Sequence, residues 1–298
     1  MNGSGASYLR AAPAMLGSAF ATGSAVVLTR LGIADMSPWM FVALRMVLAS
    51  AMVLGVAVAL GRRPLLASRP RWPQMGLLGV VNAALPIVAS TLALRYVSST
   101  ILSLLFALMP LFTSLLAHMA LADERMSLAK AAGLVVGLFG VALLLLTGST
   151  GVATQAFDWH GYALGFAGVF GAAISSVYIR RCFAGEDLWV LTAVQQVAAA
   201  AVVVAIVVLI GQWSLAQVSV TTAALAAYVA LMNSVVSFFL FMYLNQRFSA
   251  TAAALPSYLI PLVTAVLGAA LLDEVVTLPM VAGGVLIVGG LWLVNRAA

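Results

Sequence analysis

Long apolar runs follow one another along nearly the whole chain, and only short segments carrying a few charges separate them. Of the 298 residues, 64% are hydrophobic and 7% are charged, whereas a soluble domain carries roughly 25% charged residues. So few charges do not cover the surface of a water-soluble fold, and the apolar fraction excludes a disordered or fibrous chain. A β-barrel would show short alternating segments instead. The pattern therefore predicts an all-α polytopic membrane protein.

The apolar runs predict ten transmembrane helices. A helix that crosses the hydrocarbon layer needs about 20 apolar residues, and ten such helices with short loops leave no stretch for a soluble domain. Only Arg95 separates the third run from the fourth, and only Arg247 separates the eighth from the ninth. The expected spans are Ala11–Leu31, Pro38–Leu60, Pro73–Leu94, Ser99–Leu121, Ser127–Thr147, Trp159–Cys182, Leu188–Gly211, Thr222–Leu244, Ala250–Leu272 and Thr277–Val294.

The basic residues predict the orientation, because they concentrate in cytoplasmic loops. With both termini in the cytoplasm, Arg30 and Arg95 lie outside and Arg45 lies within a span. The other 11 of the 14 Lys and Arg residues then lie inside: Arg10, Arg62, Arg63, Arg69, Arg71, Arg125, Lys130, Arg180, Arg181, Arg247 and Arg296. We therefore interpret the excess of basic residues as a topology signal and not as a sign of a nucleic-acid partner. The first apolar run is expected to be a retained helix and not a cleaved signal peptide.

The chain resembles itself when it is shifted by 151 residues, which places Asn82 on Asn233 and Pro110 on Pro261. Other matches are Ser24 with Ser175, Arg30 with Arg181, Thr100 with Thr251 and, after a one-residue gap, Asp123-Glu124 with Asp273-Glu274, Gly133 with Gly283 and Gly140 with Gly290. We predict two homologous repeats, 1–148 and 149–298, of five helices each. Because five is odd, the second repeat is inverted in the membrane. Many secondary transporters have this architecture, with the substrate held near the midplane; a duplication that only builds a stable bundle is the alternative.

Asn82 and Asn233 lie at comparable depths near the middle of the third and eighth spans. Polar groups at that depth are costly, so they either line a substrate site or bond neighbouring helices. One helical face joins Asn82 to Pro86 and Ser90. The matching face of the eighth span joins Asn233 to Ser237 and Phe241.

Prolines and aromatic residues extend the candidate site. Pro110 and Pro261 each free the carbonyl four residues earlier, on Phe106 and Ser257, either to accept from a ligand's ammonium group or simply to shape a kinked helix. Aromatic rings near these spans either line a pocket for a large apolar side chain or serve packing and lipid contact. They include Phe170 and Tyr178 in the sixth span, Phe241 in the eighth and Tyr258 in the ninth.

Charges inside the membrane are scarce. Arg45 either attracts a carboxylate or snorkels and bonds helix carbonyls. All eight acids fall at span ends or loops, which favours a neutral or zwitterionic cargo over a cation; Glu274, three residues before Thr277, is expected near the start of the last helix. No zinc motif or phosphate-binding loop occurs, so we expect no cofactor, no metal and no catalytic residue.

Two segments resemble the end of an EamA domain of the drug/metabolite transporter superfamily. The first runs from Pro110-Leu111 through Ala122–Ser127 to Gly133 and Gly140-Val141. The second runs from Pro261-Leu262 through Asp273-Glu274 to Gly283 and Gly289-Gly290. Both copies carry Asp where the family often has Gly before the Glu. The chain as a whole is similar to aromatic amino-acid exporters of the YddG type.

The resemblance implies a multi-pass transporter of the bacterial inner membrane, a monomer or weak homodimer, whose partners are a small-molecule substrate and the lipid bilayer. It would export small metabolites, aromatic amino acids first, or facilitate their passage, by alternating access around a central cavity. An exporter of another neutral metabolite or drug, and a channel-like facilitator, are the alternatives.

Overall fold

The computed structural model describes residues 3–62, 71–120, 127–148, 151–152, 157–183, 186–237, 240 and 256–296. These residues form helices joined by turns and loops and contain no strand, which confirms the predicted all-α fold for the described part of the chain. The first repeat contributes α1 (Gly3–Gly32), α2 (Pro38–Ala59), α4 (Trp72–Gly79), η2 (Val80–Ala84), α5 (Leu85–Ala93), α6 (Ser99–Phe106), α7 (Met109–Ala120) and α8 (Leu128–Leu146). The second contributes α9 (Trp159–Cys182), α10 (Leu188–Leu209), η3 (Leu215–Gln217), α11 (Val220–Val229), η4 (Ala230–Val236), α14 (Pro256–Leu272) and α15 (Leu278–Arg296).

Seven helical stretches of the described chain are long and apolar enough to cross a membrane: Ala12–Gly32, Pro38–Ala59, Trp72–Ala93, Ser99–Ala120, Leu128–Leu146, Trp159–Ile179 and Trp189–Leu209. Three shorter apolar helices lie where the last three spans are predicted: Val220–Val236, Leu259–Leu272 and Leu278–Gly290. The expected break at Arg95 is present as a turn between α5 and α6. The expected break at Arg247 lies outside the described residues.

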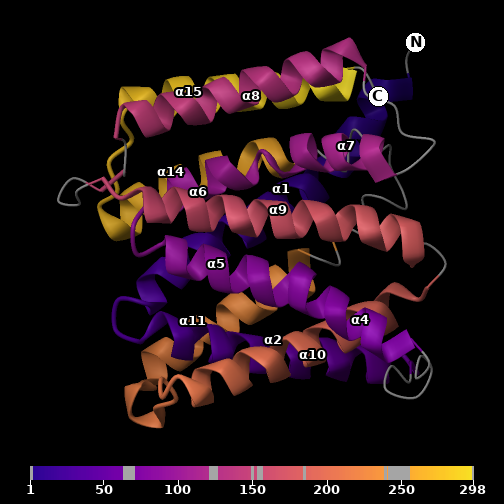
Figure 1. The fold of residues 1–298 in the computed structure, drawn as a ribbon, viewed down its shortest axis with the longest axis vertical. Helices are drawn as coiled ribbons and strands as arrows, with labels where there is room; N and C mark the ends of the chain where they lie inside the picture. The colour runs from indigo at the N-terminus through magenta and orange to yellow at the C-terminus, as the bar shows by residue number, and fades with distance from the viewer. Residues whose placement is uncertain are drawn as a thin grey trace.

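The helices lie side by side in layers (Figure 1). The pair α8 and α15 covers one side of the bundle, and α2 and α10 lie at the opposite side. Between them lie α6, α7, α9 and α14, with α1 packed against α14 and α5 packed against α9. Helix α1 begins on the same side of the bundle as the end of α15, as Figure 1 shows.

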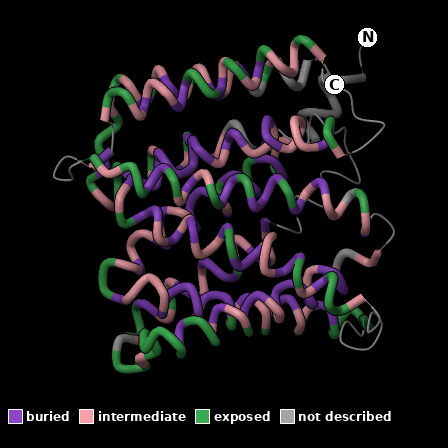
Figure 2. The backbone as a smooth tube through the Cα atoms, in the orientation of Figure 1, coloured by how far each residue is buried: buried purple, intermediate pink, exposed green. Residues whose placement is uncertain are grey.

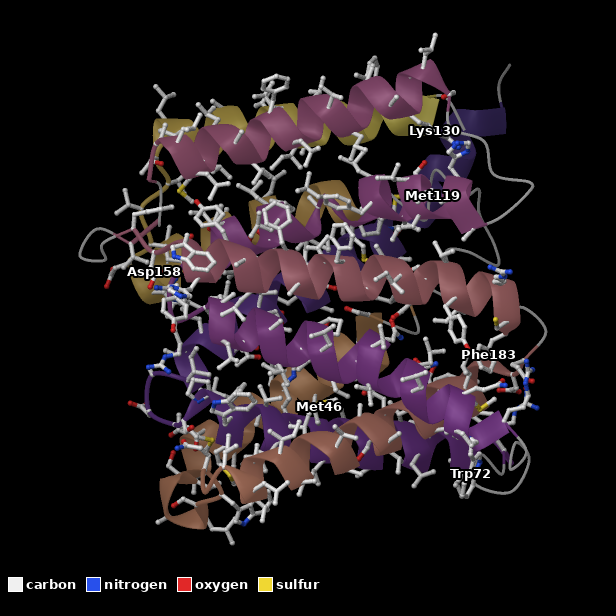
Figure 3. The ribbon with its side chains drawn as sticks, in the orientation of Figure 1. Met46, Trp72, Met119, Lys130, Asp158 and Phe183 are labelled. Carbon is white, nitrogen blue, oxygen red and sulfur yellow. The ribbon has the colours of Figure 1, made fainter. Side chains whose placement is uncertain are left out.

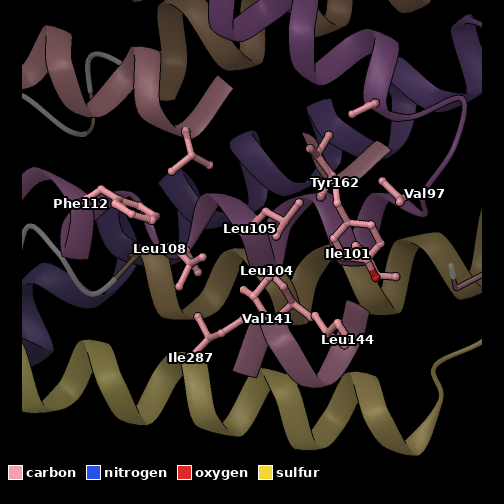
Figure 4. Packing of buried hydrophobic residues seen from close by; sticks show 14 of the residues in the cluster. Val97, Ile101, Leu104, Leu105, Leu108, Phe112, Val141, Leu144, Tyr162 and Ile287 are labelled. Atoms are coloured by element: carbon pink, nitrogen blue, oxygen red, sulfur yellow. The ribbon is translucent and has the colours of Figure 1, made fainter. Parts of the chain in front are cut away.

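The largest hydrophobic core surrounds α6, which is buried along its whole length up to Phe106 (Figure 2). Leu105 and Leu108 pack there with Val141 of α8, Tyr162 of α9 and Ile287 of α15 (Figure 4). This core therefore joins helices of both repeats through α6.

Glycines let α8 and α15 touch through their backbones. A Cβ atom on Gly290 would lie 2.3 Å from the Gly133 carbonyl oxygen, and one on Gly140 would lie 2.6 Å from the Gly283 carbonyl oxygen. The residue numbers fall along one helix as they rise along the other, so the two helices are antiparallel. Gly133 matches Gly283 and Gly140 matches Gly290 in the repeat, so each contact is the image of the other. Equivalent helices that run in opposite directions are what an inverted repeat requires.

We predict that Gly290→Ala destabilises the protein, because its Cβ would overlap backbone atoms that have no room to move. Overpacking of this kind costs roughly 1–3 kcal/mol. Gly289→Ala is the matched control, since its Cβ would meet nothing within 4 Å. Thermal unfolding in detergent should show a lower midpoint for the Gly290 variant alone; equal midpoints would contradict the close α8–α15 contact.

Candidate functional site

Both predicted asparagines lie in π-helical turns. Asn82 is in η2, between α4 and α5, and Asn233 is in η4, which follows α11. Pro86 explains the first turn in part, because proline has no N–H to donate to the Asn82 carbonyl four residues earlier. Single π turns inside α-helices are frequent at functional sites. The two turns occupy equivalent positions of the repeat, as the two asparagines do.

Each π turn packs against a helix of the other repeat: η2 against α10 and η4 against α2. The Asn82 Nδ2 group donates to Gln195 Oε1 at 2.8 Å. Gly79 allows this approach, because a Cβ there would lie 2.5 Å from the Gln195 carbonyl oxygen. Asn82 therefore bonds a neighbouring helix through its amide N–H group.

Asn233 differs from its counterpart, because its half-buried side chain makes no hydrogen bond to another described residue. Leu44 stands in α2 where the repeat places Gln195 in α10, so the matching acceptor is missing. On the same face, the Ser237 hydroxyl shares a hydrogen bond of 2.8 Å with Thr22 of α1. Ser90, on the face of Asn82, donates to the Ile87 carbonyl of its own helix at 3.1 Å. The expected Phe241 lies outside the described residues.

Pro110 coincides with a break in the fourth span. Helix α6 ends at Phe106 and α7 begins at Met109. Phe106 is half-buried and its ring lies next to Gly168 of α9. Pro261 is buried inside α14 without ending it. Ser257 and Tyr258 belong to the first turn of α14, but their side chains are outside the described part.

The predicted aromatic residues separate into two groups. Phe170 is 40% exposed, and its ring lies 4.8 Å from that of Phe112 in α7. Tyr178 lies near the end of α9, where its ring meets Phe183 edge-on at 5.8 Å. Figure 3 places Phe183 and Trp72 at one end of the bundle and Asp158 at the other. Tyr178 therefore packs at an end of α9, and the structure does not bring it together with Phe170.

Glu274 follows the end of α14, as expected of an acid at a span end, but its carboxylate bonds residues of other helices and not the start of α15. It is 5% exposed, and its Oε1 accepts from Arg30 Nη1 at 3.0 Å. The same carboxylate accepts from the Ser99 N–H and hydroxyl at 2.8 and 2.9 Å and from Thr100. It thus occupies the positive N-terminal end of α6 and not the start of α15, where the Thr277 hydroxyl has no partner among the described residues.

The other described acids with partners are less buried and also lie near helix ends. Asp187 caps the N-terminus of α10, and its Oδ2 atom lies 3.2 Å from Nε of Arg62. Glu186 forms an ion pair with Arg71. Asp158 caps α9, and hydrogen bonds from the His160 backbone N–H and imidazole hold the pKa of its carboxyl below the usual value. No cluster of residues that would hold a metal ion is present in the described chain.

Two buried glutamines were not singled out from the sequence. Gln195 and Gln196 in α10 are 4% and 8% exposed. The signal that would have found them is the repeat, because the shift of 151 residues places Arg45 on Gln196. Both Arg45 and Gln196 are buried polar residues on equivalent helices, and each carries an atom without a partner: Nε of Arg45 and Oε1 of Gln196.

The fold and these paired polar positions define a multi-pass helical membrane protein built from two repeats. A family model for the EamA-like transporter family matches residues 9–146 and 159–296. The chain belongs to this family of membrane transporters for small molecules. No curated protein matches it. A crystal structure of a protein with 21% sequence identity has a TM-score of 0.68 and covers 96% of this chain and 98% of that chain, which shows a shared fold.

We predict that Glu274→Gln strongly destabilises the protein, because it leaves the Arg30 charge without its partner. Breaking a buried ion pair costs roughly 3–5 kcal/mol. Asp273→Asn is the matched control: Asp273 is exposed and has a φ of 51°, which asparagine tolerates well. Thermal unfolding in detergent measures both variants. A Glu274 variant as stable as the control would show that the ion pair contributes little.

Proposed function

We propose that the protein is a secondary carrier that exports amino acids, aromatic ones first, across the bacterial inner membrane. The observation that carries the proposal is the placement of Asn82 and Asn233 in equivalent π turns, each packed against a helix of the opposite repeat. A cargo held between such turns would touch both repeats. A shift of one repeat against the other then changes the side from which the cargo is reached.

The proposed topology has ten membrane helices in two inverted repeats, 1–148 and 149–298, with both termini in the cytoplasm. Three observations support it: the antiparallel contact of α8 with α15, the common side on which α1 begins and α15 ends, and the basic residues of that side. Figure 3 places Lys130, Trp72 and Phe183 at that end. Arg71 directly precedes Trp72, and Arg62 pairs with Asp187, four residues after Phe183, in keeping with the positive-inside rule.

The absence of a free buried carboxylate from the described spans supports the choice of cargo. The described acids lie at helix ends, and the buried one, Glu274, is already paired with Arg30. A lipophilic cation would therefore find no free carboxylate in the described spans. Asn82, Asn233 and the carbonyl of Phe106 offer donors and acceptors for a zwitterion, and Phe170 with Phe112 offers an apolar surface for a ring.

Flux through proteoliposomes tests the proposed function. Labelled tryptophan, phenylalanine, threonine and methionine are measured with and without a pH gradient. We expect saturable flux and counterflow, with the aromatic amino acids carried fastest. Flux that rises linearly with concentration and lacks counterflow would instead favour the channel-like facilitator. Failure to carry any of the four would leave an exporter of another neutral metabolite or drug as the better assignment.

Substitutions test the two asparagines. We predict that Asn82→Ala and Asn233→Ala each lower the flux by roughly tenfold, which corresponds to the loss of about one hydrogen bond to the cargo. Ser50→Ala is the control, because its hydroxyl bonds only the carbonyl of Val47 in its own helix. Membrane insertion and yield should stay normal in all three. Unchanged flux in both single variants and in the double variant would remove the asparagines from the site.

A further inference from the structure

Arg45 is a cation buried in the first half of α2 without a counter-charge among the described residues. Its residue exposure is 5%, and no described acid forms an ion pair with it. Its Nε–H has no hydrogen-bond partner. Burial on this scale rules out the snorkelling expected of a structural arginine near an interface. Bonding to helix carbonyls, the other structural role, is likewise not seen among the described residues.

The protein's own described acids are committed elsewhere or lie too far out. Glu274, Glu186 and Asp187 pair with arginines near the ends of helices, and Asp158 pairs with His160. Asp35 and Asp273 are exposed beyond the ends of α1 and α14. A buried charge that lacks a partner is costly, and an ionisable residue inside a membrane generally marks a functional position. The described residues supply no anion for Arg45, which favours a ligand carboxylate as its partner.

Gln196 provides the complementary group on the opposite helix. It is 8% exposed, lies in α10 at the position equivalent to Arg45, and leaves its Oε1 without a donor. Helices α2 and α10 pack directly against each other, with Met46 next to Ala199 and Ala200 in one cluster. Figure 3 shows Met46 in this layer. The same cluster contains Ala83 and Ala84 of η2, directly after Asn82. The two unpartnered groups thus belong to the layer that holds the π turns.

We propose that Arg45 and Gln196 bind the charged head of a zwitterionic α-amino acid. Arg45 donates to the carboxylate, and Gln196 Oε1 accepts from the ammonium group. Helices α2 and α10 pack against each other, and packed helices lie roughly 8–10 Å apart; the assignment places the small charged head between them. This assignment rests on the proposed carrier function and narrows its cargo to molecules that carry both groups.

Ligand binding to the purified protein in detergent tests the assignment with three probes. L-Phenylalanine carries both charges, phenylalaninamide lacks the carboxylate, and 3-phenylpropionate lacks the ammonium group. We expect phenylalanine to raise the thermal midpoint at concentrations at least about tenfold lower than either analogue. Arg45→Met should abolish the preference for phenylalanine over its amide. Gln196→Leu should abolish the preference over phenylpropionate. Val47→Met, at an exposed neighbouring position of α2, should keep both preferences.

The unliganded protein supplies a second readout. Removal of an unpartnered buried charge should leave the midpoint of Arg45→Met equal to that of the native protein or raise it, whereas a structural arginine would lower it. Arg45→Lys, which keeps the charge, should retain part of the carboxylate preference. Two results would overturn the assignment of Arg45 and Gln196 without touching the carrier function, provided that amino-acid counterflow is still observed. One is a lower midpoint for Arg45→Met, and the other is equal binding of phenylalanine and its amide by the native protein. If the native protein neither binds nor transports any amino acid, the amino-acid carrier function itself is overturned.

Discussion

A polar group inside the hydrocarbon layer has no water to bond, so it must find its partner within the protein. Most polar groups of the described spans obey this constraint, and many do so by reaching across to the other repeat. Ser103 of α6 and Thr264 of α14 share a hydrogen bond of 2.6 Å, and Asn82 reaches Gln195. The bonds that satisfy buried groups are therefore also the bonds that join the two repeats. Groups that break the rule, such as Arg45 and Gln196, stand out for the same reason.

The repeat makes departures from symmetry informative. The glycine contacts of α8 and α15 are symmetric images, as expected where only close packing matters. The π turns are also repeated, but their surroundings are not, because Leu44 replaces Gln195 and Arg45 replaces Gln196. Stabilising contacts also differ between the halves, since Ala254 stands where the repeat would place the counterpart of Ser103. The buried atoms of Arg45 and Gln196 that lack partners are therefore the stronger signal. A bound molecule with two different ends needs different groups on the two sides.

The sequence was sufficient for the features that depend on apolar length and charge. The helix starting at Ser99 after Arg95 follows from residue types alone. The break before Pro110 does not, because the equivalent Pro261 leaves α14 continuous. The π turns were not predictable in this way, because they depend on how a helix adapts to its neighbours. The burial of Glu274 was missed because its stabilising partners, Arg30 and Ser99, come from distant parts of the chain. Gln195 and Gln196 were missed because the repeat places them on Leu44 and Arg45, so they lack the identical counterparts that marked Asn82 and Asn233.

Separating the two repeats breaks different contacts at each end of the bundle, so the free energy that separation requires differs between the ends. At the end that contains Glu274, opening would strip a buried carboxylate of Arg30 and of the N-terminal turn of α6. At the opposite end, the pair of Arg62 with Asp187 is well exposed, with 52% and 31% of the side chains accessible, and exposed pairs contribute about 0–1 kcal/mol. The described conformation is thus held more firmly at the Glu274 end. For the proposed carrier, this distribution of contacts favours opening on the side where α1 begins and α15 ends. A cargo that opened the other end would have to supply binding energy to offset the Glu274 contacts.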